Sequence, residues 1–136
     1  MAAVDPLEER IVEIRKRDRR FSRQAYEFIL EALDHTIAVM GKDRLTGEER
    51  HVGGRELLLG IKDFASKRFG PMAPFVFRQW GVRRTDDFGE IVFNLIDAGL
   101  LSRRDSDSRL DFQDGFDFDR VFDEAFRDHL SELGSS

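Results

Sequence analysis

The sequence predicts a mainly α-helical protein with about six helices and one small β-hairpin. The first observation behind this prediction is the helical spacing of apolar residues, which is clearest at Phe88, Ile91 and Leu95. The second is the separation of such segments by glycine and proline, as at Gly70-Pro71. The third is a polar turn between two short extended pieces within residues 100–112. Thirteen phenylalanines against one tyrosine and one tryptophan predict a core rich in phenylalanine.

The chain of 136 residues is predicted to form a single domain, residues 1–136, of ordinary size. Three parts are distinguished within it. Residues 1–54 form an N-terminal pair of helices followed by a loop, residues 55–112 form a winged-helix-like part, and residues 113–133 contain a C-terminal helix.

The N-terminal part is predicted to hold two helices. Asp5 is a suitable N-cap and Pro6 a suitable first residue for a helix that runs to about residue 16. Ser22 is placed to cap a second helix over residues 23–40, which Gly41 ends. The apolar side chains of these helices are Leu7, Ile11, Ile14, Tyr26, Phe28, Ile29, Leu30, Ala32, Leu33, Ile37, Val39 and Met40. Residues 41–54 are polar and contain glycine, which predicts a loop.

The middle of the chain is predicted to hold a third helix over residues 55–68 and a fourth over residues 72–80. The break at Phe69-Gly70-Pro71 separates the two helices, because proline and glycine interrupt helical hydrogen bonding. The connection Val82-Arg83-Arg84 then leads into the fifth helix, the clearest in the chain.

The fifth helix contains Asp87-Phe88-Gly89, the string that holds magnesium in protein kinases. The chain lacks the Gly-rich loop, the strand lysine and the HRD loop that accompany this string in kinases. Thr85 is instead predicted as a helix N-cap. This places Asp86 and Asp87 in the first turn, where carboxylates complement the helix dipole. The string is therefore the start of a capped helix, which Gly99 ends.

The predicted hairpin pairs residues 100–104 with residues 108–112 across the turn 105–107. After the loop at Gly115, a last helix is predicted over residues 118–133. Its side chains expected to pack against the body are Val121, Phe122, Ala125, Phe126, Leu130 and Leu133.

The net charge of −5 gives no general attraction to polyanions, but the charge is unevenly spread. Residues 1–24 carry seven basic and five acidic side chains, whereas residues 105–136 carry three basic and ten acidic ones. The basic cluster consists of Arg15, Lys16, Arg17, Arg19, Arg20 and Arg23. This asymmetry marks a polyanion site at one end, or else two ends that face each other or the solvent.

Several chemistries lack their residues in this sequence. The absence of cysteine excludes disulfides, thiolate metal sites and cysteine nucleophiles. His35, His51 and His129 do not have the spacing of a metal motif, and residues 111–119 fail the register of a calcium loop. No catalytic, metal-binding or cofactor-binding residue is therefore predicted. The lack of a long apolar run and of a signal-peptide pattern predicts a soluble, cytoplasmic protein that does not enter a membrane.

The order of elements over residues 55–112 resembles a winged-helix domain, in which a recognition helix precedes a two-stranded wing. In a DNA reader of this type, the outward face of the fifth helix enters the major groove. The side chains predicted on that face are Asp87, Glu90, Asn94 and Asp97. Carboxylates beside phosphates oppose the electrostatic attraction on which DNA affinity depends, which argues against DNA recognition by this helix.

Four strings carry a resemblance to a known family, namely HVGGRELLLGI (51–61), FGPMA (69–73), WGVRRTDDFGEIVFNLIDAGLLS (80–102) and DFDRVFDEAF (117–126). They resemble an uncharacterised family of short bacterial proteins associated with planctomycetes and verrucomicrobia. Gly53 stands where the family pattern has serine, a difference that bears on the capping of the third helix. The resemblance implies a bacterial protein and brings no activity, cofactor or site residue.

Two functional hypotheses follow from the sequence. The first is a non-enzymatic protein-interaction module, with a protein partner or self-association through the outward face of the fifth helix and through Phe93, which is expected to be exposed. The alternative is a nucleic-acid or ribosome-associated protein that binds through arginine clusters, either residues 15–23 or Arg83, Arg84, Arg103 and Arg104. An enzyme would need a deep pocket with converging titratable groups, for which the sequence names no candidate.

Overall fold

The computed structural model describes residues 6–104 and 107–134, which form six α-helices and three short 3-10 helices. In chain order the elements are α1 (Pro6–Arg17), α2 (Arg23–Val39), η1 (Gly47–Arg50), α3 (Gly54–Phe69), η2 (Gly70–Met72), α4 (Ala73–Gln79), α5 (Thr85–Asp97), η3 (Arg109–Phe112) and α6 (Phe118–Gly134). The mainly α-helical prediction is therefore confirmed. No helix among the described residues is long and apolar enough to cross a membrane.

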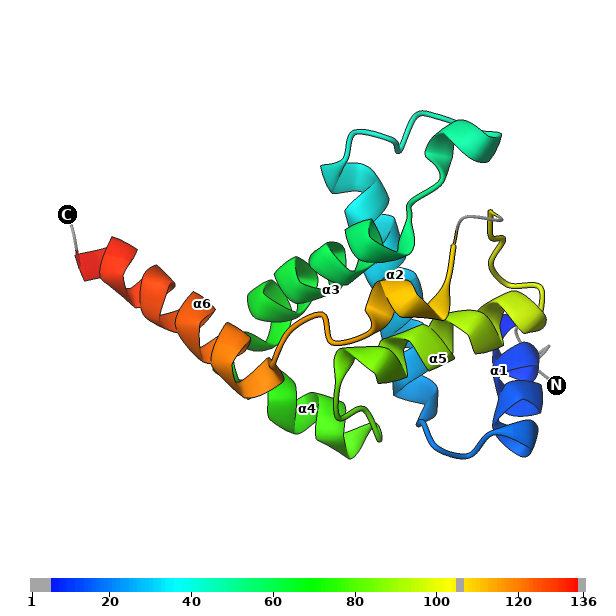
Figure 1. The fold of residues 1–136 in the computed structure, drawn as a ribbon, viewed down its shortest axis with the longest axis horizontal. Coiled ribbons are helices and arrows are strands. Elements are labelled where there is room, and N and C mark those ends of the chain that lie inside the picture. Colours follow the sequence, from blue (N-terminus) through cyan, green and yellow to red (C-terminus); the bar gives the residue numbers. More distant parts are fainter. Residues whose placement is uncertain (1–5, 105–106, 135–136) are drawn as a thin grey trace, which may run out of the picture.

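The central helices are α2 and α3, and α5 packs against both of them. Helix α1 contacts α2 at one end of the molecule, whereas α6 projects from the other end, so the basic and acidic ends of the chain lie far apart (Figure 1). The predicted alternative in which these two ends face each other is therefore wrong. An ion pair between Arg78 and Asp119, at 3.4 Å, joins α4 to the first turn of α6.

The core is rich in phenylalanine, as predicted, and Phe77 lies at its centre. The Phe77 side chain is completely buried. Its ring contacts the rings of Phe28, Phe69, Trp80, Phe88, Phe118 and Phe122. Because these partners come from α2, α3, α5, α6 and the end of α4, one side chain of the short helix α4 joins most of the fold.

The start of α5 differs by one residue from the prediction, since Arg84 and not Thr85 is the N-cap. The carboxylate of Asp87 accepts hydrogen bonds from the backbone N–H groups of Arg83 (2.8 Å) and Arg84 (3.3 Å). The Thr85 side chain is buried. Its hydroxyl donates to the carbonyl of Phe112 (2.7 Å) and accepts from the N–H of Gly115 (2.8 Å). Thr85 therefore ties α5 to a distant loop, and Asp87 caps the helix.

The predicted wing is absent from the described residues, which contain no β-strand. The second predicted strand is the 3-10 helix η3, because Ser108 and Asp111 cap that segment locally. The Ser108 hydroxyl accepts from the N–H of Leu110 (3.1 Å), and Asp111 accepts from the N–H of Ser108 (3.2 Å). Residues 105–106 of the predicted turn 105–107 and the predicted cap Asp5 lie outside the described residues.

Two helices extend beyond the core further than predicted. Val39 and Met40, at the end of α2, are exposed, as are Phe126, Leu130 and Leu133 in the second half of α6. Only the first half of α6 buries side chains, Phe118 and Phe122, and the helix then leaves the body of the protein (Figure 1). The prediction that Phe126, Leu130 and Leu133 pack against the core is therefore wrong, because these side chains lie on the part of α6 that leaves the body.

Candidate functional site

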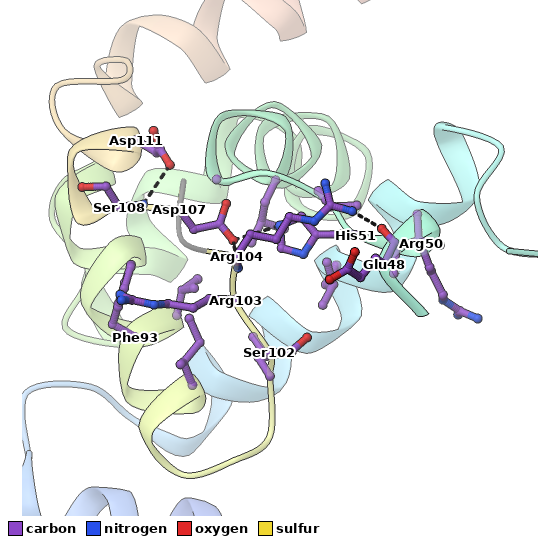
Figure 2. A pocket seen from close by; sticks show the side chains of 18 of the residues that line it. Glu48, Arg50, His51, Phe93, Ser102, Arg103, Arg104, Asp107, Ser108 and Asp111 are labelled. Atoms are coloured by element: carbon purple, nitrogen blue, oxygen red, sulfur yellow. Dashed lines mark hydrogen bonds and ion pairs between the residues drawn. The ribbon is translucent and has the colours of Figure 1, made fainter. Parts of the chain in front are cut away.

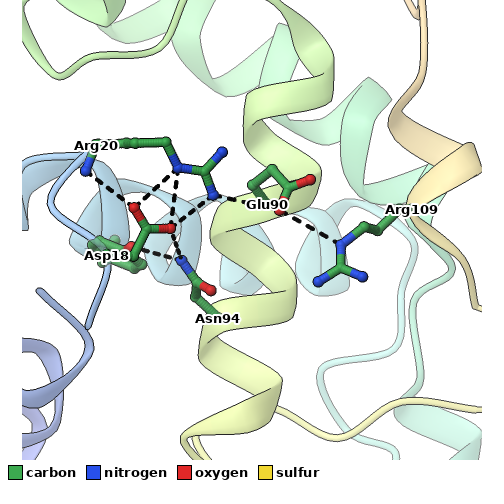
Figure 3. A network of polar contacts seen from close by, with 6 residues as sticks. Asp18, Arg20, Glu90, Asn94 and Arg109 are labelled. Carbon is green, nitrogen blue, oxygen red and sulfur yellow. Dashed lines mark hydrogen bonds and ion pairs between the residues drawn. The ribbon is translucent and has the colours of Figure 1, made fainter.

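The outward face predicted for α5 is largely engaged within the protein (Figure 3). The carboxylate of Glu90 lies between two arginines, 3.5 Å from Arg20 and 3.6 Å from Arg109. The amide of Asn94 donates hydrogen bonds to Asp18 (3.0 Å) and to the hydroxyl of Tyr26 (3.1 Å). This side of α5 therefore holds the α1–α2 turn in place.

Asp18 is the centre of this network. The Arg20 guanidinium donates hydrogen bonds of 2.7–3.2 Å to the Asp18 carboxylate and holds the pKa of Asp18 well below its usual range. Burial raises the pKa of Tyr26, which shares Asn94 with Asp18. Asp18 is thus ionised at neutral pH, and its negative charge is shared by Arg20 and Asn94.

Phe93 is buried, so the expectation that it is exposed is wrong. The segment after α5 folds back over the helix and covers the ring. The guanidinium of Arg109 lies 4.8 Å from the ring centroid and that of Arg103 lies 5.7 Å from it. Of the five predicted interaction residues, Asp97 alone is exposed, and it has no polar partner among the described residues. The structure therefore does not bring these five residues together as a docking surface.

The four arginines named around α5 fall into two separate places. Arg83 and Arg84 precede the helix, whereas Arg103 and Arg104 follow it, and the 13 residues of α5 separate the pairs. Arg83 and Arg84 instead lie near the α1–α2 turn. There the N–H of Ser22 donates to the carbonyl of Trp80 (3.0 Å), and Gly81 lies directly against the backbone of Arg20.

Exposed arginines lie on the end of α1, on the α1–α2 turn and on the connection before α5. The exposed arginines there are Arg15, Arg17, Arg19, Arg83 and Arg84, which are called the basic edge below. None of them has a carboxylate partner among residues 6–104 and 107–134. Lys16, Arg20 and Arg23, which sequence alone grouped with them, form ion pairs with Glu13, Asp18 and Glu27.

A cleft of about 470 Å³ lies between the η1 loop and residues 101–104 and 107–108 (Figure 2). Helices α2, α3 and α5 form its floor. The apolar floor residues are Ile37, Leu57, Val92, Phe93, Ile96 and Leu101, and the ionisable rim residues are Glu48, Arg50, His51, Arg103, Arg104, Asp107 and Asp111. The sequence named no candidate pocket, whereas the fold brings residues of distant segments together around this cleft.

Two polar contacts join the walls of this cleft. Arg104 crosses to the carbonyl of Glu48, and Nε2 of His51 lies 2.9 Å from the Asp107 carboxylate (Figure 2). The His51 Nε2 atom is buried and has no well-aligned hydrogen bond. Asp107 is already engaged, because its carboxylate accepts a hydrogen bond from the backbone N–H of Arg104 (2.9 Å).

A second exposed feature lies on α6. Phe126, Leu130 and Leu133, which are called the α6 stripe below, are 38%, 50% and 65% exposed and occupy one face of the helix. Helix α6 contacts η2 and α4, which carry the exposed side chains of Met72 (55%) and Phe75 (53%). Apolar side chains are thus gathered at this end of the molecule.

Comparisons with known proteins add nothing to this description. No protein-family model matches the chain, and no curated protein and no solved structure matches it. The resemblance to an uncharacterised bacterial family stays a prediction.

Proposed function

We propose that the protein is a non-enzymatic interaction module that docks a basic amphipathic helix of a partner protein on the α6 stripe. The observation that carries this proposal is the exposure of Phe126, Leu130 and Leu133 on one helical face. Contiguous exposed apolar residues rimmed by polar ones are typical of protein-interaction sites. The proposal places this module in a bacterial cytoplasm, in line with the sequence resemblance.

The projecting half of α6 lacks the packing of an apolar face that normally stabilises a helix. Most helical stability in proteins comes from packing of an apolar face, and short helices are marginal without it. Phe118 and Phe122 supply such packing only for the first half of α6. A partner helix on the α6 stripe would supply it for the second half, in the helix-against-helix mode used by many amphipathic ligands.

The charges around the α6 stripe favour a basic partner. Both arginines of α6 are engaged within the helix, Arg120 with Glu124 (3.1 Å) and Arg127 with Asp123 (3.0 Å). Asp128 and Glu132 are exposed on the projecting half and have no cationic partner among the described residues. A partner helix with lysine or arginine beside its apolar stripe would complement these carboxylates.

We expect a designed helical peptide with a leucine stripe and lysine flanks to bind the protein. The same peptide with glutamate flanks should not bind, because it meets the acidic surface of α6. The double variant Phe126→Ser/Leu130→Ser should weaken binding of the lysine peptide at least about tenfold, since apolar anchors dominate such interfaces. Fluorescence anisotropy of labelled peptide measures all three affinities.

The control is Leu59→Ser, which removes an exposed leucine (64%) from α3 and should leave the affinity unchanged. An equal affinity for the lysine and glutamate peptides would contradict the proposal. So would a loss of affinity in Leu59→Ser as large as that in the double variant. Analytical ultracentrifugation of the free protein tests whether a second copy of the chain covers the α6 stripe instead. A stable dimer that Leu130→Ser dissociates would assign the α6 stripe to self-association and overturn the basic-partner assignment.

The basic edge supports a second candidate function, the binding of a nucleic acid. The observation behind it is that Arg83 and Arg84 follow a segment that adjoins the α1–α2 turn, and that the arginines of the basic edge form no ion pair with a described carboxylate. Such a surface neutralises phosphates and releases counterions, so its affinity depends on salt. Arg103 and Arg104 do not belong to this candidate surface.

For this second candidate we expect measurable binding of a single-stranded oligonucleotide at low salt. The slope of log affinity against log salt should decrease by about 0.7 for each arginine removed in Arg83→Ala and Arg84→Ala. Arg120→Ala/Arg127→Ala on α6 is the control, and it should leave the slope unchanged because both arginines are ion-paired far from the basic edge. No binding at low salt, or the same slope in every variant, would exclude a nucleic-acid partner here.

A further inference from the structure

We infer that the cleft between the η1 loop and residues 101–104 and 107–108 is a binding site for a small apolar molecule with one anionic head group, which Arg103 receives. This site is separate from the α6 stripe and from the basic edge, and it belongs to neither proposed function. The inference depends on the volume of the cleft, on its apolar floor and on guanidinium groups at its mouth that form no ion pair with a described carboxylate.

The volume and floor of the cleft suit a small organic molecule. Ligand cavities measure roughly 300–1,000 Å³ and are mostly apolar with a few polar groups that fix orientation. This cleft measures about 470 Å³. Val92, Ile37 and Phe93 in its floor are 8%, 7% and 6% exposed, whereas most core side chains are almost completely buried, so the cleft reaches the edge of the core.

The rim cations lack anionic partners in the described structure. Arg104 donates to the carbonyl of Glu48, Arg50 donates to the carbonyl of Asp43 (3.5 Å), and Arg103 has no hydrogen-bond partner among the described residues. None of the three is ion-paired to a carboxylate in residues 6–104 and 107–134.

Two of the three rim carboxylates, in contrast, accept hydrogen bonds from the backbone. Asp107 accepts from the N–H of Arg104 and approaches His51, and Asp111 accepts from the N–H of Ser108. Glu48 is exposed to solvent. The rim thus carries both signs of charge, and its arginine side chains are not occupied by the carboxylates beside them.

Arg103 is the rim arginine best placed to receive the head group. Its guanidinium is held by the ring of Phe93, which lines the floor, and not by a carboxylate. An arginine stacked on an aromatic face keeps its N–H donors available for a carboxylate, sulfonate or phosphate. Arg109 also stacks on Phe93, but the carboxylate of Glu90 lies 3.6 Å from it.

The test compares two fluorescent probes with the same aromatic skeleton. Anilinonaphthalene sulfonate carries an anionic group, and N-phenylnaphthylamine does not. We expect the sulfonate probe to bind more tightly and Arg103→Gln to weaken it about tenfold, the loss of one charge-assisted hydrogen bond, while binding of the neutral probe stays unchanged. Arg83→Gln on the basic edge is the matched control and should change neither affinity. Decanoate should displace the sulfonate probe, whereas decanol should do so poorly.

Because the α6 stripe is a second apolar surface, every titration is repeated in the Phe126→Ser/Leu130→Ser variant. Sulfonate binding that persists there, with amide NMR shifts at His51, Val92 and Leu101, supports the cleft. Loss of binding in that variant, equal affinity for the two probes, or no effect of Arg103→Gln would overturn the inference.

Discussion

Replacing Phe77 by alanine is expected to lower the free energy of unfolding by about 4 kcal/mol, the loss typical of a fully buried phenylalanine. The ring of Phe77 lies 5.1 Å from that of Phe88 and 5.2 Å from that of Phe118, in edge-to-face arrangements that add to the burial of apolar surface. Because its neighbours come from four other helices and from Trp80, the surrounding backbone cannot collapse into the space left by the ring.

The control for this experiment lies two residues away in the same helix. Phe75 is 53% exposed, so Phe75→Ala should change the free energy of unfolding by less than about 0.5 kcal/mol. Urea denaturation followed by far-ultraviolet circular dichroism measures both variants without depending on Trp80, whose fluorescence the Phe77 substitution alters directly. A loss below about 1 kcal/mol for Phe77→Ala would show that this cluster does not organise the core.

The composition predicted an aromatic core but not which ring lies at its centre. Phe77 belongs to the seven-residue helix α4, which is too short to show a clear apolar stripe. Its partners are spread over residues 28–122. Local periodicity identifies which residues of one helix share a face, whereas the choice of a central residue depends on how the helices pack together.

Helix α5 shows the same limit of local sequence patterns, here for Phe93, a predicted interaction residue. Helical spacing correctly placed Phe88, Ile91 and Leu95 inward. It also left Phe93 outside the stripe, because no local pattern indicates that residues 100–104 and 107–112 return to cover that side of the helix. Arg103 and Arg109, which complete the cover, lie ten and sixteen positions further along the chain.

The cleft was not predictable from the sequence for a related reason. His51 and Asp107 meet at 2.9 Å although 56 positions separate them, and each stands in a polar segment that indicates only a loop. The α6 stripe is the opposite case. Its amphipathic spacing was visible in the sequence, but the point where α6 leaves the body depends on where α4 and η2 end.

Replacing Gly60 by alanine is expected to lower the free energy of unfolding by about 3 kcal/mol, because α2 and α3 cross too closely for a side chain at this position. A Cβ atom on Gly60 would overlap Oγ1 of Thr36 and would lie 2.8 Å from the Thr36 Cβ. Thr36 is buried, and its hydroxyl donates to the carbonyl of Ala32 (2.7 Å), so the side chain cannot turn away without losing that bond.

The sign of this effect is informative, since alanine in a helix interior normally stabilises by about 1 kcal/mol relative to glycine. Gly134→Ala is the control, because no atom lies within 4 Å of a Cβ built there. In the double variant Thr36→Ala/Gly60→Ala the overlapping hydroxyl is gone, and part of the stability should return. Chemical denaturation of the four variants of this cycle should give a coupling energy of about 2 kcal/mol between the two positions. Two results would contradict this expectation: additive losses of unfolding free energy in the cycle, or a Gly60→Ala protein as stable as the parent. Either result would mean that α2 and α3 can separate at low cost. This crossing would then not fix the distance between the two central helices.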